Sequence, residues 1–436
     1  MDILKFDLSQ EGKPFKKLNC TNGGPWHKRH AATQYRSNFE EYKAARIPFS
    51  RNHDSGVCNV YGGPYSHDIS RIFPNFDADP CQPESYDFAC TDEDILVCAQ
   101  AGTQTYFRLG ETIEHQIKKH ATLPPKDFQK WAVICEHIIR HYNEGWADGY
   151  HLDIQYWEIW NEPDLDPEDA PAKRTWGGST AQYYDLFATA AKHLKACFPH
   201  LKIGGPALAH GVAWAEKFLQ EMQARSVPID FFSWHIYCAD PNKILLRAEK
   251  IQALLVKYGY ANTENHLNEW NYVKGWTDEF KYSINSIHGM KGAAFIAACI
   301  CLAQSSPIDL LMYYDTRPSA FNGVFDFYTY EPLKGYYPLY WYGMFYEMEK
   351  QIPAENQIEN IYSLCGVDKD GKVLSVITYY TDNNEADNKQ FSVDFGRDSQ
   401  FEVYLLDEKH TNALVKTTGD LTFDMSPNSC ILIREI

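Results

Sequence analysis

Short apolar runs alternate with longer amphipathic stretches over most of the chain. The runs predict eight β-strands, at residues 17–21, 48–52, 105–109, 156–161, 202–205, 231–237, 266–268 and 310–314. The stretches between them predict helices at 31–45, 125–143, 179–198, 213–225, 241–258, 283–304 and 335–349, with a weaker one at 92–101. Ser179 and Asp240 are typical helix N-cap residues. This alternation indicates an α/β fold, a (β/α)8 TIM barrel with enlarged loops.

The pattern changes after Pro353, where helical spacing stops and short alternating runs begin. These runs predict seven strands, at 362–367, 373–379, 390–395, 401–407, 412–415, 421–424 and 430–434. They indicate a C-terminal antiparallel β-sandwich, and a strand-like segment at 3–8 is expected to join it. We therefore predict an N-terminal strand within 1–14, a catalytic barrel over 15–352 and a sandwich domain over 353–436.

Composition narrows the classes of partner. The net charge of −17 argues against nucleic acid and against an anionic membrane, because both require a basic surface. The longest apolar stretch, 293–303, is too short to span a bilayer. The twelve cysteines form no Cys-x-x-Cys pair, so a zinc or redox motif is not expected. No basic segment followed by an apolar one opens the chain, which favours a cytoplasmic protein, although a secreted protein with its leader removed also fits.

Two glutamates end predicted strands and stand beside amides. Glu162 lies in Trp157-Glu-Ile-Trp-Asn-Glu-Pro-Asp-Leu165, after the fourth strand, and Glu269 lies in Leu267-Asn-Glu-Trp-Asn271, at the seventh. Strands four and seven lie across the mouth of such a barrel, so residues at their ends can face each other. A retaining glycosidase needs two carboxyl groups about 5–5.5 Å apart. The two glutamates are therefore candidates for an acid/base and a nucleophile.

These two motifs resemble those of the retaining glycosidases of clan A, and within them glycoside hydrolase family 39. That family includes β-xylosidases and α-L-iduronidases. The resemblance implies that Glu162 is the acid/base and that Glu269 is the nucleophile. It also implies a barrel with a sandwich, a small oligosaccharide or glycoside as substrate, and no cofactor.

The resemblance also implies roles for residues at other strand ends. His53, in Ser50-Arg-Asn-His-Asp54, is a candidate ligand of a sugar hydroxyl, and Arg51 is equally compatible with a place beneath the site or in a buried ion pair. Tyr237 is expected to donate a hydrogen bond to the nucleophile, with His235 touching substrate. Asn161 and Trp270, next to the two glutamates, are further candidate substrate contacts.

The end of the eighth strand departs from the family pattern. Related enzymes often carry a Trp there, whereas this chain has Tyr314, so Tyr314 or a later aromatic such as Phe325 is expected to supply the platform for the sugar ring. Asp315 and Arg317 are candidate substrate contacts. For Glu111, after the third strand, a structural or solvated role is favoured over a third carboxylate in the cleft.

The sequence leaves alternatives for substrate, activity and metal binding. A pentose glycoside (a β-xyloside or an arabinose-containing glycoside) is expected first, and a uronide bound through Lys274 and Arg317 second. A carbohydrate-binding protein without turnover is the rival from another class. The histidines form no ligand set with fixed spacing, and a solvated loop is favoured over a calcium site for the acidic residues 164–169, so no metal is expected. The histidines in question are His27, His30, His53 and His67.

The oligomeric state is not set by the sequence.

Overall fold

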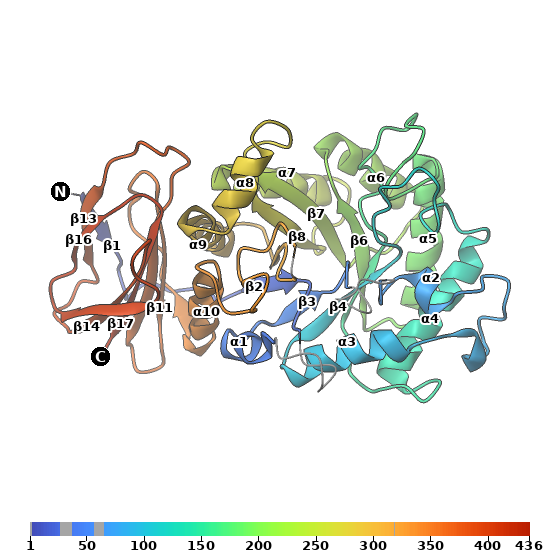
Figure 1. Cartoon of the computed structure of the whole chain (residues 1–436), viewed down its shortest axis with the longest axis horizontal. Helices are drawn as coiled ribbons and strands as arrows, with labels where there is room; N and C mark the ends of the chain where they lie inside the picture. The colour runs from blue at the N-terminus through green and yellow to red at the C-terminus, as the bar shows by residue number, and fades with distance from the viewer. Residues whose placement is uncertain (1, 27–36, 56–64, 318) are drawn as a thin grey trace.

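The computed structural model describes residues 2–26, 37–55, 65–317 and 319–436. Eight parallel strands close into a barrel in chain order, which confirms the predicted TIM barrel and all eight predicted strands (Figure 1). The barrel strands are β2 (Lys17–Asn22), β3 (Phe49–Arg51), β4 (Gln104–Leu109), β5 (Tyr156–Ile159), β6 (Lys202–Leu208), β7 (Phe231–Cys238), β8 (Glu264–Tyr272) and β9 (Leu310–Tyr313).

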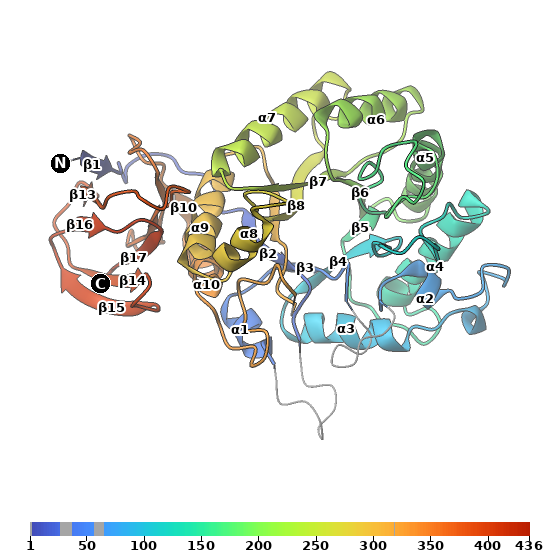
Figure 2. The ribbon, with the colours of Figure 1, turned by 45° about the horizontal axis from the view of Figure 1, so that its top comes forward.

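Helices follow the strands and form the outer layer of the barrel (Figure 2). Ser179 forms a reciprocal capping box with Gln182, and Asp240 accepts a hydrogen bond from the Asn242 backbone, so both predicted N-caps are confirmed. The described helices are α1 (Phe39–Ala44), α2 (Ile69–Ile72), α3 (Ala89–Gln100), α4 (Phe128–Glu144), α5 (Thr180–Cys197), α6 (Val212–Ala224), α7 (Pro241–Lys257), α8 (Phe280–Ile287), α9 (Met290–Gln304) and α10 (Tyr336–Met344), with 3-10 turns η1 (Pro83–Ser85) and η2 (Phe345–Glu347).

Two predicted helices differ from the structure. The helix predicted at 283–304 is broken between α8 and α9, which meet at 77°. Gly289 lies at the break in an extended conformation, and glycine is among the least favourable residues inside a helix. The helix predicted at 31–45 begins only at Phe39 within the described part, and residues 31–36 lie outside it.

The barrel interior is layered. An apolar group that includes Phe49, Phe231 and Leu310, each the first residue of its strand, fills the end of the barrel where the strands begin. Farther along the strands the interior becomes polar and charged, with Arg51 and Glu158 fully buried. The polar layer leads to the mouth formed by the carboxyl ends of the strands, where active sites of this fold lie.

The residues after the barrel form two packed sheets (Figure 1). Strand β1 pairs in parallel with β13, so both chain ends lie in this unit, whereas the other pairings are antiparallel. The domain limits predicted at 14/15 and 352/353 stay predictions. One sheet contains β1 (Asp2–Lys5), β13 (Lys389–Asp394) and β16 (Thr422–Met425); the other contains β10 (Lys350–Gln351), β11 (Ile361–Val367), β12 (Val373–Tyr379), β17 (Ser429–Glu435), β14 (Phe401–Leu406) and β15 (Ala413–Thr418).

Helix α9 joins the sandwich to the barrel. Strand β12 is buried along its whole length, because Val373 and Ile377 face the smaller sheet while Leu374 and Val376 belong to the core that contains α9. No single described helix is long and apolar enough to cross a membrane. The bent pair α8 and α9 together has the length and composition of a membrane span, but most of α9 is buried in the core.

Candidate active site

Different backbone conformations bring the two glutamates to one site. Glu162 follows β5 in a left-handed conformation with φ of 48°. On β8 the pairing shifts between Leu267 and Trp270, and on β7 between Trp234 and His235. Asn268 and Glu269, although consecutive, therefore both contact residues of the barrel interior, Glu158 and Arg51 respectively.

Glu162 and Glu269 both approach the same nitrogen of His235. The imidazole Nδ1 is 2.7 Å from Glu162 Oε1 and 3.4 Å from Glu269 Oε2. A carboxylate oxygen of Glu162 and one of Glu269 lie within 4.8 Å of each other. This approach is compatible with the roughly 5–5.5 Å between the carboxyl groups of a retaining glycosidase.

Arg51 anchors Glu269 from below the mouth. Its guanidinium donates to Glu269 Oε1, to Glu158 Oε2 and to Asn161 Oδ1, each at 2.7 Å. Arg51 therefore combines the two predicted alternatives: it lies beneath the site and also forms a buried ion pair. Glu158 also accepts from Ser233 and Asn268, so this carboxylate is satisfied within the barrel.

Electrostatics at the site is dominated by burial and by opposite charges. Burial raises the pKa of Glu269, with His235 and Arg51 acting in the opposite direction. Burial alone would lower the pKa of His235, but the charges of Glu269 and Glu162 outweigh it and that pKa is raised. Tyr237 donates to Glu269 Oε2 at 2.9 Å, and burial keeps the pKa of this phenol well above its usual value, so it stays a donor.

A second polar group borders the site at the ends of β3 and β9. Arg317 donates to Asp54 Oδ2 at 2.9 Å and to Asp315 Oδ2 at 2.5 Å, and Tyr314 donates to Asp54 Oδ2 at 2.8 Å. Burial alone would raise the pKa of Asp54, but the Arg317 guanidinium and the Tyr314 hydroxyl outweigh it and that pKa is lowered. Asp315 is fully buried, with both oxygens bonded to protein. Substrate contacts by Tyr314, Asp315 and Arg317 stay predictions.

His53 lies beside this group as a neutral donor. Arg108 donates to its Nδ1 at 2.9 Å, so the proton of the neutral ring lies on Nε2, 3.3 Å from Asp54 Oδ1. Burial lowers the pKa of His53 well below its usual value, and neighbouring arginines act in the same direction. The ring can offer one N–H to a ligand, and the predicted contact with a sugar hydroxyl stays a prediction.

Aromatic rings form one wall of the site. Tyr237 has its ring centroid 5.3 Å from Trp276, 5.7 Å from Phe321 and 6.2 Å from Tyr314. Phe321 and Trp276 were missed by the sequence analysis, because both lie on loops after the strands and no motif marks them. Phe325 is buried beside Tyr42 and Tyr336 instead, so it is not grouped with this wall.

Trp270 is not brought to the site. The shifted pairing before it sends the side chain outward, where it is fully buried and packs against Tyr313 and against Phe295 of α9. The alternation of side chains along a strand explains this, since its neighbour Glu269 faces inward. The predicted substrate contact of Trp270 is therefore wrong in this structure.

Comparison with known proteins places the fold and the motifs in a family. The model of glycosyl hydrolases family 39 matches residues 96–324, slightly more than half of the chain, and the match includes Glu162 and Glu269. The chain belongs to this family.

Two curated relatives of this family 39 chain are described as beta-xylosidases. The one from Geobacillus stearothermophilus is 28% identical over 198 residues, which cover 40% of the chain and 36% of that protein. The one from Caldicellulosiruptor saccharolyticus is 30% identical over 142 residues, covering 32% of the chain and 25% of that protein. The chain thus matches a little more than a third of the length of the first relative and a quarter of the second.

Solved structures share the whole fold. A glucosidase from Croceicoccus marinus superposes with a TM-score of 0.80 at 22% identity and covers 100% of this family 39 chain and 99% of the other. A GH39 beta-xylosidase from Caulobacter crescentus gives 0.71 at 15% identity, with 100% of both chains covered. An alpha-L-arabinofuranosidase from Thermotoga maritima gives 0.68 at 15% identity, with 99% of each covered. These likenesses support the barrel with its sandwich.

Outside the mouth cluster, several candidate residues have structural partners. Glu111 is buried and accepts from the Ser70 backbone and hydroxyl, so in the family 39 chain it supports α2. In the acidic segment 164–169, Asp164 accepts from two backbone N–H groups and Asp166 binds Arg174. His27 and His30 lie outside the described residues.

Proposed function

We propose that the protein is a retaining exo-glycoside hydrolase that cleaves a pentose glycoside, with Glu162 as acid/base and Glu269 as nucleophile. The observation that carries the proposal is the approach of the two carboxylates to within 4.8 Å, with Glu269 held by Arg51 and Tyr237. Exo action is taken from the resemblance to family 39. The choice of a pentose is supported by the two curated relatives, which are beta-xylosidases.

In the first step Glu269 attacks the anomeric carbon while Glu162 gives its proton to the departing glycosidic oxygen. Arg51 and Tyr237 bind the two oxygens of Glu269 and aim the carboxylate, so little reorganisation is needed when it attacks. The bond from the anomeric carbon to the aglycone oxygen breaks, and the sugar becomes an ester of Glu269.

In the second step water replaces the aglycone. Glu162, now a carboxylate, takes a proton from this water as its oxygen attacks the anomeric carbon and releases Glu269. Esterification removes the negative charge of Glu269, which favours the ionised form of Glu162 at the moment when it must act as a base. The anomeric configuration is retained, because two inversions occur.

His235 gives the acid/base a partner for its proton. The 2.7 Å contact from Nδ1 to Glu162 Oε1 can hold one proton on either atom. When the proton lies on the carboxyl group the imidazole is a neutral acceptor, and Glu162 can donate to the leaving group. We therefore assign His235 two further roles: it positions Glu162, and it exchanges a proton with it. Its contact with substrate stays a prediction.

The uronide alternative has less support than the pentose. Arg317 is bound by Asp54 and Asp315, and Lys274 lies 3.2 Å from Asp382. A substrate carboxylate would have to compete with these acidic side chains for each cation. The binding-protein alternative also has less support, because both carboxylates are present and positioned.

Hydrolysis of aryl glycosides tests the proposal. The panel contains β-xyloside, α-arabinofuranoside, α-arabinopyranoside, β-glucoside and α-iduronide, and we expect release from a pentoside with retained configuration by proton NMR. Glu269→Gln should abolish release, whereas Glu331→Gln, on an exposed loop, should leave it unchanged. Binding of the panel without turnover would favour the binding protein, and full activity of Glu269→Gln would overturn the nucleophile.

Glu162 needs a test of its own. Glu162→Ala should lose turnover of glycosides with poor leaving groups, while an activated dinitrophenyl glycoside still forms the glycosyl-enzyme, because such a leaving group needs no proton. Added azide should then accelerate release by replacing the activated water. Equal losses with both leaving groups, and no effect of azide, would remove Glu162 from the acid/base role.

A further inference from the structure

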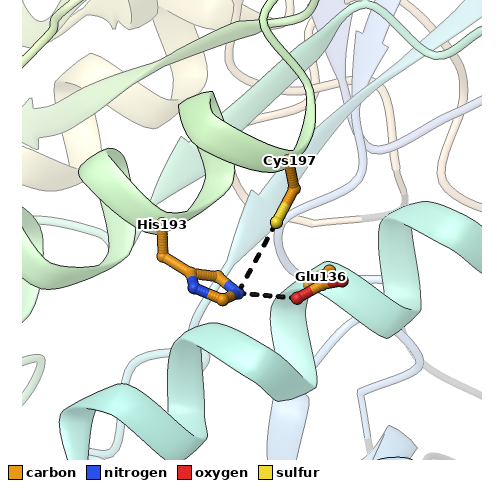
Figure 3. Close-up of side chains that lie close together, drawn as sticks. All are labelled: Glu136, His193 and Cys197. Carbon is orange, nitrogen blue, oxygen red and sulfur yellow. Dashed lines mark hydrogen bonds and ion pairs between the residues drawn. The ribbon is translucent and has the colours of Figure 1, made fainter.

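Three side chains that could hold a metal ion lie together between α4 and α5, on the outer layer of the barrel (Figure 3). Glu136 projects from α4, whereas His193 and Cys197 project from α5, four residues apart on one helical face. Their donor atoms lie within 4.8 Å of one another. The group takes no part in the proposed reaction, since it lies on the helical layer away from the mouth.

The distances are close to those of a metal site. His193 Nε2 is 2.7 Å from Glu136 Oε2 and 3.9 Å from Cys197 Sγ. Ligand bonds of about 2.0–2.3 Å in a tetrahedral zinc site place donor atoms roughly 3.3–3.8 Å apart. Small side-chain rotations would therefore bring all three donors onto one ion, with water as the fourth ligand.

The surroundings orient two of the three ligands. Arg140 donates to Glu136 Oε1 at 2.9 Å, which leaves Oε2 directed at His193. Gln129 Nε2 lies 3.0 Å from His193 Nδ1, and with this amide turned over its oxygen would accept the Nδ1 proton when Nε2 binds a metal. Partners of this kind fix the ring and raise ligand strength in known metal sites.

The dipole of α5 also favours a cation here. Cys197 is the last residue of α5, so it lies at the negative end of the helix dipole. On binding, the Cys197 thiol would release its proton to solvent, and the proton of the neutral His193 ring would lie on Nδ1, which leaves Nε2 for the metal. One carboxylate, one thiolate and a neutral imidazole then balance the two positive charges of zinc.

We propose that Glu136, His193 and Cys197 form a zinc-binding site that fastens α4 to α5. A mixed sulfur, nitrogen and oxygen donor set suits zinc better than the hard ions calcium or magnesium. Because α4 packs against α5, an ion held by both helices would resist their separation.

Cobalt provides a test that is specific to the thiol. Protein treated with a chelator is titrated with Co²⁺, and we expect a thiolate-to-cobalt charge-transfer band that zinc displaces. The band should vanish in Cys197→Ser and persist in Cys81→Ser, which removes an exposed thiol elsewhere. The other group of candidate donors among the described residues, Glu162, His235 and Glu269, has no thiol and cannot give this band.

Zinc binding and stability provide the second test. Calorimetry of Glu269→Gln, which weakens the mouth cluster as a competing site, should show one equivalent of zinc, and Gln129→Ala should weaken binding roughly tenfold. In the Glu269→Gln protein zinc should raise the melting temperature, and adding His193→Gln should abolish that rise. Absence of the cobalt band, or equal zinc affinity of Glu269→Gln with and without Cys197→Ser, would overturn the site and leave a hydrogen-bonded cluster.

Discussion

Arg51 is the residue on which the charge balance of the site depends. Its guanidinium is fully buried and contacts two carboxylates, Glu158 within the barrel and Glu269 at the mouth. Burial alone would lower the pKa of the arginine, but these carboxylates outweigh it and raise that pKa further. Glu158 therefore acts on the site indirectly. Its carboxylate shares the positive charge of Arg51 with Glu269.

Arg51→Lys should lower kcat by roughly 10²–10³, which is the usual effect of removing one preorganised donor. The ammonium keeps the charge but cannot reach Glu158, Glu269 and Asn161 together. The measurement is kcat on the preferred aryl glycoside, with a melting curve to show that the barrel remains folded. A kcat within twofold of wild type would contradict the assigned role of the three contacts.

His235 should make stability depend on pH. Its pKa is raised in the folded protein, so its contribution is fully present below the ordinary value of 6.5 and is lost as pH rises through the folded value. The difference in melting temperature between wild type and His235→Gln should therefore shrink from pH about 6 to pH about 9. Exposed His200→Gln is the control and should show no such trend. A difference that grows with pH would show that His235 is neutral in the fold.

At the scale of elements, the repeat of strands and helices was predictable because it depends on local hydrophobic spacing. All eight barrel strands follow from that pattern, and so do the caps at Ser179 and Asp240. The pairing shifts on β7 and β8 did not follow from it, because a bulge depends on how neighbouring strands align. That is why Glu269 was placed in the site while Trp270 was wrongly expected beside it.

The same limit applies to loops that supply the site. Tyr237 and Glu162 lie at or just after strand ends, where the sequence pattern gives their position. The hydrogen bond from Tyr237 to Glu269 was expected from the family resemblance, whereas the contact of Glu162 with His235 was not predicted. Phe321 and Trp276 lie in segments without periodicity, so only the folded backbone brings them to the aromatic wall. Arg108 was missed because its partner His53 comes from another strand.

The starts of three strands are joined by Glu264, and this junction should matter for acid stability. Glu264, on β8, contacts Lys202 of β6 and Tyr156 of β5. Burial opposes ionisation, but hydrogen bonds from His266, Lys202 and Tyr156 lower its pKa from 4.5 to about 2. Its stabilisation is therefore present above pH 4.5 and is lost as pH falls through about 2.

Glu264→Gln should reduce the free energy of unfolding by about 2 kcal/mol at neutral pH, after allowance for the partial exposure of the side chain. Wild type and variant should converge as pH falls toward 2. Urea denaturation at several pH values measures the difference. A gap that persists unchanged at the lowest pH would mean that packing, and not charge, accounts for the effect.

At the scale of the whole molecule, barrel and sandwich share a core. Residues of β12 and of α9 belong to one hydrophobic cluster that also fills the space around the barrel. Tyr380, just after β12, also donates through its hydroxyl to the Ala239 carbonyl beyond β7, at 2.5 Å. The sandwich therefore contacts a loop at the mouth, and its removal would expose the apolar face of α9. We infer that the two parts unfold together.

Asp382 gives this inference a single-residue test. From the sandwich it accepts a hydrogen bond from Tyr272 at 2.5 Å and lies 3.2 Å from Lys274 and 3.3 Å from Lys291, all on the barrel. It also borders, with Tyr237 and Trp276, a cavity of about 490 Å³ beside the mouth. Loss of its charge would leave the largely buried ammonium of Lys291 with weaker compensation.

Asp382→Ala should lower the free energy of unfolding by about 2 kcal/mol. Breaking a fully buried ion pair costs about 3–5 kcal/mol, and the partial exposure of this one reduces the effect. Asp370→Ala, in an exposed turn of the sandwich, is the matched control and should change little. Because the core is shared, fluorescence of the barrel tryptophans and far-ultraviolet circular dichroism should shift to the same new midpoint. Two separate transitions in wild type would show that the parts fold independently and that Asp382 only docks them.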